Sequence, residues 1–212
     1  MIYEFPDLSE PLRQGDIFIR LPRIEISLKE ILLAEEFGPR LISWDKIAST
    51  SEPISLILQV RPVIGIVASQ DCDARRSRDI TLCEIRDFKQ VEGKCKDTSS
   101  SKSWKTIITQ HARINQKWFY LPPDEKAGLL DKMAVDFMVT LRIPREDLEA
   151  MRSLRKARLN KIARDHFRER ISEFFRRYSY NEWYALNKEE LNAYLSEYPD
   201  TTPYEWQKRE SN

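Results

Sequence analysis

The sequence lacks the features that mark membrane proteins, secreted proteins and zinc sites. Its 212 residues contain no apolar run long enough to cross a bilayer. The first ten residues, MIYEFPDLSE, are acidic and have neither the basic nor the apolar region of a secretory signal. The three cysteines (Cys72, Cys83 and Cys95) form no Cys-x-x-Cys pair, which suggests neither a zinc site nor a redox motif. We therefore expect a cytoplasmic protein that does not bind membranes.

The chain also lacks an excess of charge of either sign. Thirty-five Lys and Arg stand against 34 Asp and Glu, which gives a net charge of +1. This balance excludes a globally basic nucleic-acid binder and an acidic tail protein. Charged residues make up 33% of the chain and hydrophobic residues 41%, a composition typical of a globular protein with a buried core.

Short apolar segments bounded by Gly, Pro and polar residues predict several strands. Pro22 and the pair Arg61-Pro62 are expected to end two of them, since proline cannot donate to a ladder. The strands on either side of residues 69–78 are expected to form an antiparallel pair, and alternation predicts that the last strand is half-buried. The predicted strands cover residues 17–21, 54–60, 63–68, 80–85, 117–121 and 135–141.

Three segments have the spacing or caps of helices. Residues 25–37 carry apolar side chains at helical intervals and stop at Gly38-Pro39. A long helix is predicted from Pro144 to about Tyr178, with a break near Ser153 as an alternative. A last helix is predicted to begin at Asn187, where Glu190 completes an N-cap signature.

Several segments, in chain order, resemble the PemK/MazF family of toxins. Residues 14–18, QGDIF, resemble that family's (R/Q)-G-D-I opening, and residues 61–69, RPVIGIVAS, resemble its R-P strand. Residues 119–122, FYLP, and the strand at 135–141 resemble the later strands of the family. The resemblance covers roughly residues 12–148, with an insertion after Arg20.

The resemblance implies an α+β fold built on a small SH3-like antiparallel β-barrel. The barrel domain is expected to cover residues 1–148, with a helical insertion at about 21–60. The remaining residues, 149–212, are expected to form a C-terminal helical extension, because they lie beyond a minimal toxin of this family.

The family cleaves single-stranded mRNA without a metal ion, usually as a homodimer restrained by an antitoxin. Its chemistry depends on the arginine of the R-P motif, here Arg61, and on a Ser or Thr of the next strand. At that position this sequence has Glu84-Ile85-Arg86 instead. The resemblance therefore implies a bacterial toxin-like RNA-binding protein with endoribonuclease activity, a second copy and an antitoxin-like inhibitor. The alternative is a catalytically inactive binding or regulatory module in a stress or phage-defence system.

A polar cluster, Ser69-Gln70-Asp71-Cys72-Asp73, follows the most apolar strand. In one interpretation Asp71 is a general base beside Arg61 and Arg86, which bind the cleaved phosphate. In a second, Asp71 and Asp73 hold Mg²⁺ or Mn²⁺ together with Glu84. In a third, the aspartates cap a turn and bind no ligand, so no cofactor is required.

Other polar residues are candidates for contact with RNA. His111 lies in a polar and basic stretch, where it could act as a general acid or base or be merely solvated. The arginine-rich segment from Arg152 to Arg177 could bind phosphates or form a solvated helix face. The expected RNA-contacting residues are Gln14, Ser69, Gln70, His111 and Arg113.

Overall fold

The computed structural model describes residues 2–50, 52–88, 117–176, 188–197 and 199. The chain divides into two compact units, Met1–Phe174 and Phe175–Asn212. The second unit contains α7 (Lys188–Glu197), which confirms the helix predicted from Asn187. In the described part of the chain no helix is both long and apolar enough to cross a bilayer.

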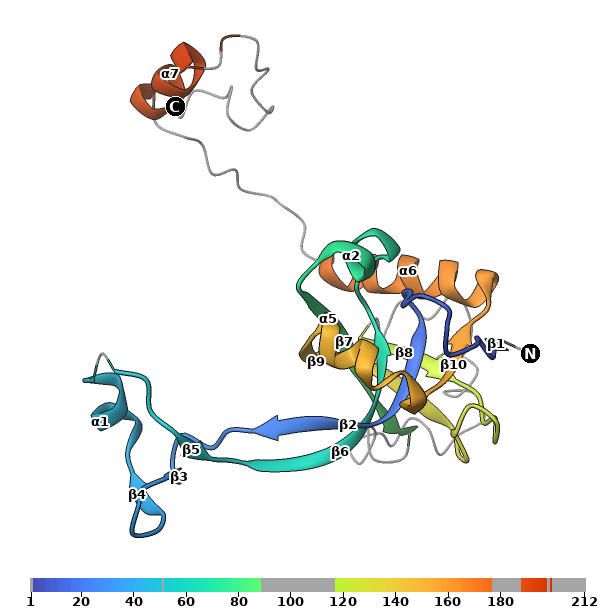
Figure 1. The fold of residues 1–212 in the computed structure, drawn as a ribbon. Coiled ribbons are helices and arrows are strands. Elements are labelled where there is room, and N and C mark those ends of the chain that lie inside the picture. The colour runs from blue at the N-terminus through green and yellow to red at the C-terminus, as the bar shows by residue number, and fades with distance from the viewer. Residues whose placement is uncertain (1, 51, 89–116, 177–187, 198, 200–212) are drawn as a thin grey trace, which may run out of the picture. The chain divides into compact units, whose positions relative to one another are not determined.

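A seven-stranded antiparallel sheet forms the centre of the first unit and curls into a half-barrel (Figure 1). The structure thus confirms an α+β fold with a barrel-like antiparallel sheet. The strand order is β1-β10-β2-β6-β7-β9-β8. The strands are β1 (Tyr3–Glu4), β2 (Asp16–Glu25), β6 (Gln59–Val67), β7 (Asp79–Asp87), β8 (Trp118–Leu121), β9 (Met133–Pro144) and β10 (Arg155–Leu159).

Neighbouring residues of the central strands point to opposite sides of the sheet, and a separate core cluster lies on each side. Ile17 and Ile66 belong to one core cluster, which contains Phe167 of α6 (Lys161–Arg176). Phe18 and Val67 belong to the other, which contains buried side chains of α2 (Asp71–Arg76) and α5 (Arg145–Ala150). The strand predicted at 63–68 forms part of β6: residues 63 and 65–67 are buried, whereas Ile64 and Ala68 are half-buried.

The segment predicted as one long helix contains a strand. After α5 come a 3₁₀ turn (Arg152–Leu154) and then β10, which lies between β1 and β2. Arg155 and Arg158 of this strand pair with the buried carboxylate of Asp16, and these contacts override the helical spacing. β10 and α6 up to Phe174 belong to the first compact unit.

The insertion is formed mainly by strands and not by the predicted helix. β2 and β6 continue to pair as far as Glu25 and Gln59. Between them lies a small sheet of order β4-β3-β5, with the short helix α1 (Trp44–Ala48). Its strands are β3 (Ile31–Leu33), β4 (Arg40–Ile42) and β5 (Leu56–Ile57). Residues 24–60 are called the arm below.

Two proline positions expected to end strands lie inside them. Pro22 of β2 and Pro62 of β6 face each other as partners in the ladder. Proline has no N–H group to donate to the ladder. Because the two prolines face each other, the missing hydrogen bonds fall at one position of the ladder, and both strands continue beyond it. Arg61, the neighbour of Pro62, is thereby held within β6.

Candidate functional site

Three arginines surround one glutamate where β2, β6 and β7 run side by side. Glu84 and Arg86 are two residues apart on β7, so their side chains lie on the same face of the sheet. Arg61 Nη2 lies 3.0 Å from Glu84 Oε1, and Arg86 Nε lies 3.4 Å from the same oxygen. Arg23 of β2 pairs with the other oxygen, Glu84 Oε2. The Glu84 side chain is only 4% exposed, and we call these four residues the arginine cluster.

Two further carboxylates adjoin the arginine cluster. Arg61 Nε lies 2.7 Å from Glu25 Oε1, and the hydrogen bond from Arg61 holds the pKa of Glu25 below its usual value. Arg86 Nη1 lies 3.7 Å from Asp136 Oδ2. Burial raises the pKa of Asp136, because a low-dielectric environment disfavours its charged form. Burial and the charge of Asp136 raise the pKa of Cys83 to about 12, so its thiol stays protonated at neutral pH.

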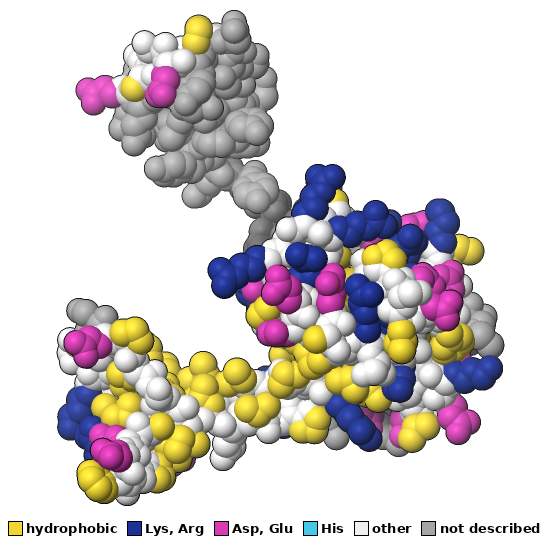
Figure 2. Space-filling view, in the orientation of Figure 1, with side chains coloured by type: hydrophobic (Ala, Val, Ile, Leu, Met, Phe, Trp, Pro, Cys, Tyr) yellow, Lys and Arg dark blue, Asp and Glu magenta, His cyan; other side chains and the backbone are white. Residues whose placement is uncertain are grey.

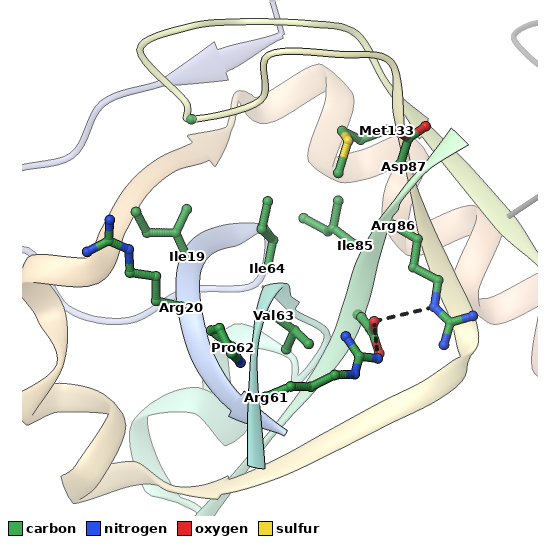
Figure 3. Close-up of a pocket in the computed structure, with 12 residues that line it drawn as sticks. Ile19, Arg20, Arg61, Pro62, Val63, Ile64, Ile85, Arg86, Asp87 and Met133 are labelled. Carbon is green, nitrogen blue, oxygen red and sulfur yellow. Dashed lines mark hydrogen bonds and ion pairs between the residues drawn. The ribbon is translucent and has the colours of Figure 1, made fainter. Parts of the chain in front are cut away.

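An open pocket of about 470 Å³ lies beside the arginine cluster (Figure 3). Its floor is apolar, since Ile19, Ile64 and Ile85 point to the same side of their strands. Its edge is charged, and Arg61 and Arg86 contribute to it. The lining residues are Ile19, Arg20, Arg61, Pro62, Val63, Ile64, Glu84, Ile85, Arg86, Asp87, Gly128 and Met133.

A β-bulge in β2 places a further arginine at this pocket. Phe18 pairs with Gly65 and Leu21 pairs with Val63, so β2 has one more residue than β6 between these points. Arg20 lies in the bulge with a φ of 55°, a left-handed conformation that is costly for a residue with a side chain. The exposed Arg20 side chain lines the pocket on the side opposite Arg86 (Figure 3).

The structure does not bring Asp71 to Arg61 and Arg86. Asp71 begins α2, beyond the C-terminal end of β6, whereas Arg61 lies near the start of that strand. Its carboxylate accepts hydrogen bonds from the backbone N–H of Gln14 at 2.9 Å and from Arg168 Nη2 at 2.8 Å. Burial opposes ionisation of Asp71, but these partners hold its pKa below the ordinary value. Asp71 therefore joins α2 and α6 to the loop that contains Gln14.

The other polar residues predicted near Asp71 are largely engaged within the fold. Gln14 is buried, donates to Ala68 O at 2.8 Å and accepts from Arg168 Nε at 2.6 Å. Ser69 Oγ accepts a hydrogen bond from the amide of Thr81 at 2.9 Å. Gln70 is the exposed N-cap residue of α2. Of these three residues, Gln14 is buried, Ser69 is half-buried and Gln70 is exposed.

The residues considered for a metal ion lie apart. Glu84 is surrounded by arginines, which repel cations, whereas Asp71 and Asp73 lie on α2. Within the described ranges no group of three His, Cys, Asp or Glu is placed to hold a metal. The remaining two candidates, His111 and Arg113, lie outside the described residues.

Three residues of this site were not found from the sequence. Arg20 and Arg23 precede the arm, and nothing in the linear sequence relates them to Glu84. Alternation predicted that Asp136 faces solvent, but it is buried and pairs with Glu84 across β7 and β9. A register shift between Cys83 and Glu84 breaks the alternation there. The only sign in the sequence that Asp136 belongs to the site is that it is an acidic residue within a largely apolar strand.

Comparison with known proteins assigns no family to this site. No protein-family model matches the chain, and no curated protein matches it. The function must therefore be argued from the arginine cluster and the adjoining pocket.

Proposed function

We propose that the protein is a toxin-like RNA-binding protein that cleaves single-stranded RNA at the pocket beside the arginine cluster. The observation that carries this proposal is the convergence of Arg23, Arg61 and Arg86 on one carboxylate at the edge of an open pocket. Guanidinium groups bind phosphate oxygens with the same forked geometry that they use for carboxylates. The phosphodiester of RNA can therefore take a place beside Glu84.

Two further features of the pocket support an RNA ligand. Arg86 Nε is buried and lies 3.4 Å from Glu84 Oε1 but makes no hydrogen bond among the described residues, so this N–H gains a partner if Arg86 turns toward a phosphate. The apolar floor formed by Ile19, Ile64 and Ile85 suits the flat face of a base or a ribose. Arg20, on the opposite side, can contact a neighbouring phosphate.

In the proposed reaction Glu84 is the general base. It accepts the proton of a ribose 2′-hydroxyl while the 2′-oxygen forms a bond to phosphorus and the bond to the 5′-oxygen breaks. Water protonates the departing 5′-oxygen, and the products carry a 2′,3′-cyclic phosphate and a 5′-hydroxyl. Arg61 and Arg86 stabilise the additional negative charge on the phosphoryl oxygens. Glu84 replaces Asp71 in this role because Asp71 contacts Gln14 and Arg168 instead.

The proposal extends to the fold subtype, the location and the partners of the protein. The chain-order resemblance of the segments at 14–18, 61–69 and 119–122 supports an SH3-like barrel. A cytoplasmic location gives access to mRNA, and an antitoxin-like protein would restrain the activity. Binding of RNA is confined to one face of a chain whose net charge is close to zero.

A second candidate is a catalytically inactive binding or regulatory module in a stress or phage-defence system. The ion pairing of Glu84 favours this candidate, because a carboxylate surrounded by three arginines is a weak base until the arginines turn to another anion. Both candidates place the same ligand in the same pocket. They differ only in whether Glu84 removes a proton.

The test is cleavage of a fluorescent single-stranded RNA by the purified full-length chain, with EDTA or with Mg²⁺. We expect equal cleavage in both conditions, and products that end in a cyclic phosphate. Arg61→Ala should reduce the rate by about 10²-fold or more, the usual effect of losing one donor to the reacting oxygen. Arg142→Ala is the matched control, since this arginine pairs with Asp79 elsewhere on the sheet and is 75% exposed.

The outcomes separate the two candidates. Cleavage that Arg61→Ala abolishes supports the endoribonuclease. Binding without cleavage, lost in Arg61→Ala, supports the inactive module. Cleavage that stops in EDTA overturns the proposed mechanism. A protein that neither binds nor cleaves the RNA overturns both candidates.

A further inference from the structure

The arm has an unusually apolar surface. Among the described residues, ten of the sixteen exposed large hydrophobic side chains lie in its 37 residues (Figure 2). Isolated exposed apolar residues are ordinary, but a concentration of this kind marks an interaction surface. The ten are Ile24, Ile26, Leu28, Leu32, Phe37, Leu41, Trp44, Ile54, Ile57 and Val60.

The arm has almost no core of its own. Within its described residues, the buried apolar side chains are Ile31 and Ile47. A three-stranded sheet needs an apolar face packed against something to be stable. The edge strands β4 and β5 also each leave one side unpaired among the described residues, and such edges accept further contacts. A partner that covers the arm would therefore stabilise it.

The charge of the arm differs from that of the rest of the first unit. Residues 24–60 contain six acidic and three basic side chains, a net charge of −3. Outside the arm, the described residues up to 174, namely 2–23, 61–88 and 117–174, contain 21 basic and 19 acidic side chains, a net charge of +2. These ranges, which we call the body, include the basic residues of α2 and of α6 up to Phe174. Figure 2 shows Lys and Arg side chains interspersed with Asp and Glu on the visible face of the body. Arm and body are complementary in charge.

We propose that the arm is the docking surface for a second copy of this chain, with each arm packed on the body of the other copy. The complementary charges favour this arrangement, whereas pairing of two arms would bring together two segments of charge −3. RNA is a poor occupant for the same reason, because its phosphates would meet an acidic surface. A reciprocal exchange closes the assembly at two copies. This inference does not depend on RNA cleavage.

The first test is the oligomeric state of the full-length chain by sedimentation equilibrium at low and high NaCl concentrations. We expect a dimer whose dissociation constant rises at least tenfold between 0.1 and 0.5 M NaCl. Phe37→Ser should weaken the dimer at least tenfold, because Phe37 is 99% exposed between β3 and β4, so its loss removes an exposed apolar group without removing a core contact. Leu130→Ser is the matched control, since Leu130 is 77% exposed and belongs neither to the arm nor to α2 or α6, whose basic residues are proposed to face the arm.

Charge reversal separates the two ways of pairing the copies. Glu30 and Glu36 are exposed and make no ion pair among the described residues, so Glu30→Lys with Glu36→Lys changes charge alone. We expect this double variant to weaken the dimer at least tenfold. A dimer that strengthens with salt or with charge reversal would overturn the arrangement, as would a dimer unaffected by Phe37→Ser. A chain that stays monomeric at 0.2 mM in 0.1 M NaCl would overturn the proposal altogether.

Discussion

Glu84 is the residue that distinguishes the two candidate functions. In the proposed endoribonuclease it removes a proton, and in the inactive module it only balances the charge of three arginines. Glu84→Gln keeps the shape of the side chain but removes the base. We expect cleavage to fall by about 10²-fold or more, while affinity for uncleavable RNA rises because a negative charge leaves the phosphate site.

Cleavage kinetics and fluorescence anisotropy measure the two effects separately. Unchanged cleavage in Glu84→Gln would exclude Glu84 as the base. Reduced cleavage with equally reduced RNA affinity would instead indicate that Glu84 only holds the arginines in place.

Asp136 should give the protein a stability that depends on pH in a specific direction. Its pKa is raised in the folded state, mainly by burial, so the folded protein binds this proton more tightly than the unfolded chain. The wild type therefore loses stability as the pH rises from the ordinary aspartate pKa of about 3.9 to the raised value. Asp136→Asn lacks this loss, so the difference in unfolding free energy, variant minus wild type, should increase with pH over that range.

Urea unfolding of both proteins between pH 4 and 7 measures this difference. If the ion pair with Arg86 outweighs burial, the difference will decrease with pH instead. In that case Asp136 would act as a stabilising partner of Arg86.

At the residue scale the sequence identified part of the site. Arg61, Glu84 and Arg86 were named from the R-P motif and from the departure at the Ser or Thr position, and the structure brings all three together. Asp71 was grouped with them because it follows the strand that contains Arg61. However, Arg61 lies near the start of β6 and Asp71 lies beyond its end, with about six residues of the strand between them. Arg20 and Arg23 could not be found, since the place of Arg23 beside Glu84 and of Arg20 at the pocket depends on how β2 pairs with β6 across the arm.

At the scale of elements, β10 is held to β2 by a buried ion-pair cluster. Asp16 accepts from Arg158 Nε at 2.5 Å and from Arg155 Nη1 at 3.2 Å, and both Asp16 and Arg155 side chains are fully buried. Removing one partner of a buried pair leaves an uncompensated charge. Asp16→Asn should therefore lower the free energy of unfolding by about 3 kcal/mol or more.

The matched control for this prediction is Asp79→Asn, which removes an aspartate from the exposed pair with Arg142. It should cost less than about 1 kcal/mol. Chemical denaturation of the three proteins gives the comparison. Equal losses in both variants would show that the Asp16 cluster contributes no more than a surface pair.

The elements that the sequence predicted correctly are those whose local pattern agrees with their tertiary place. The strands at 63–68, 80–85 and 117–121 are short, largely apolar segments bounded by polar residues or proline, and were found. The helix predicted from Pro144 to about Tyr178 is interrupted, as the alternative of a break near Ser153 allowed. The strand β10 that follows the break was not predicted, because the contacts of Arg155 and Arg158 with Asp16 determine it. The helix predicted at 25–37 failed because apolar residues at helical intervals also suit β3, whose strand partners are distant in sequence.

At the scale of the whole molecule, the near-zero net charge conceals an uneven distribution. The arm is acidic, whereas the body that contains the arginine cluster is basic. The sequence showed the totals, but the arm could be defined only once the paired ends of β2 and β6 were known. The average charge therefore excludes neither a local RNA site on the body nor a protein contact on the arm.

The division into two compact units predicts that the first is stable without most of the second. A chain that ends at Arg176 keeps the whole of α6, including the core residues Phe167 and Phe174. We expect its melting temperature to change by less than about 2 °C, a loss of under about 1 kcal/mol. Differential scanning calorimetry measures this change, and a decrease of more than about 5 °C would show that residues 177–212 contribute to the core.

The central claim is that single-stranded RNA binds at the arginine cluster, and equilibrium binding tests it most directly. Fluorescence anisotropy with a 2′-O-methyl RNA, which cannot be cleaved, should show binding that weakens with salt. The double variant of Arg61→Ala and Arg86→Ala should lose at least tenfold in affinity and reduce the slope of log K against log salt by about 1.4, for two phosphate contacts. Arg142→Ala should bind as the wild type does. Equal affinity and equal slope in all three proteins would contradict the account.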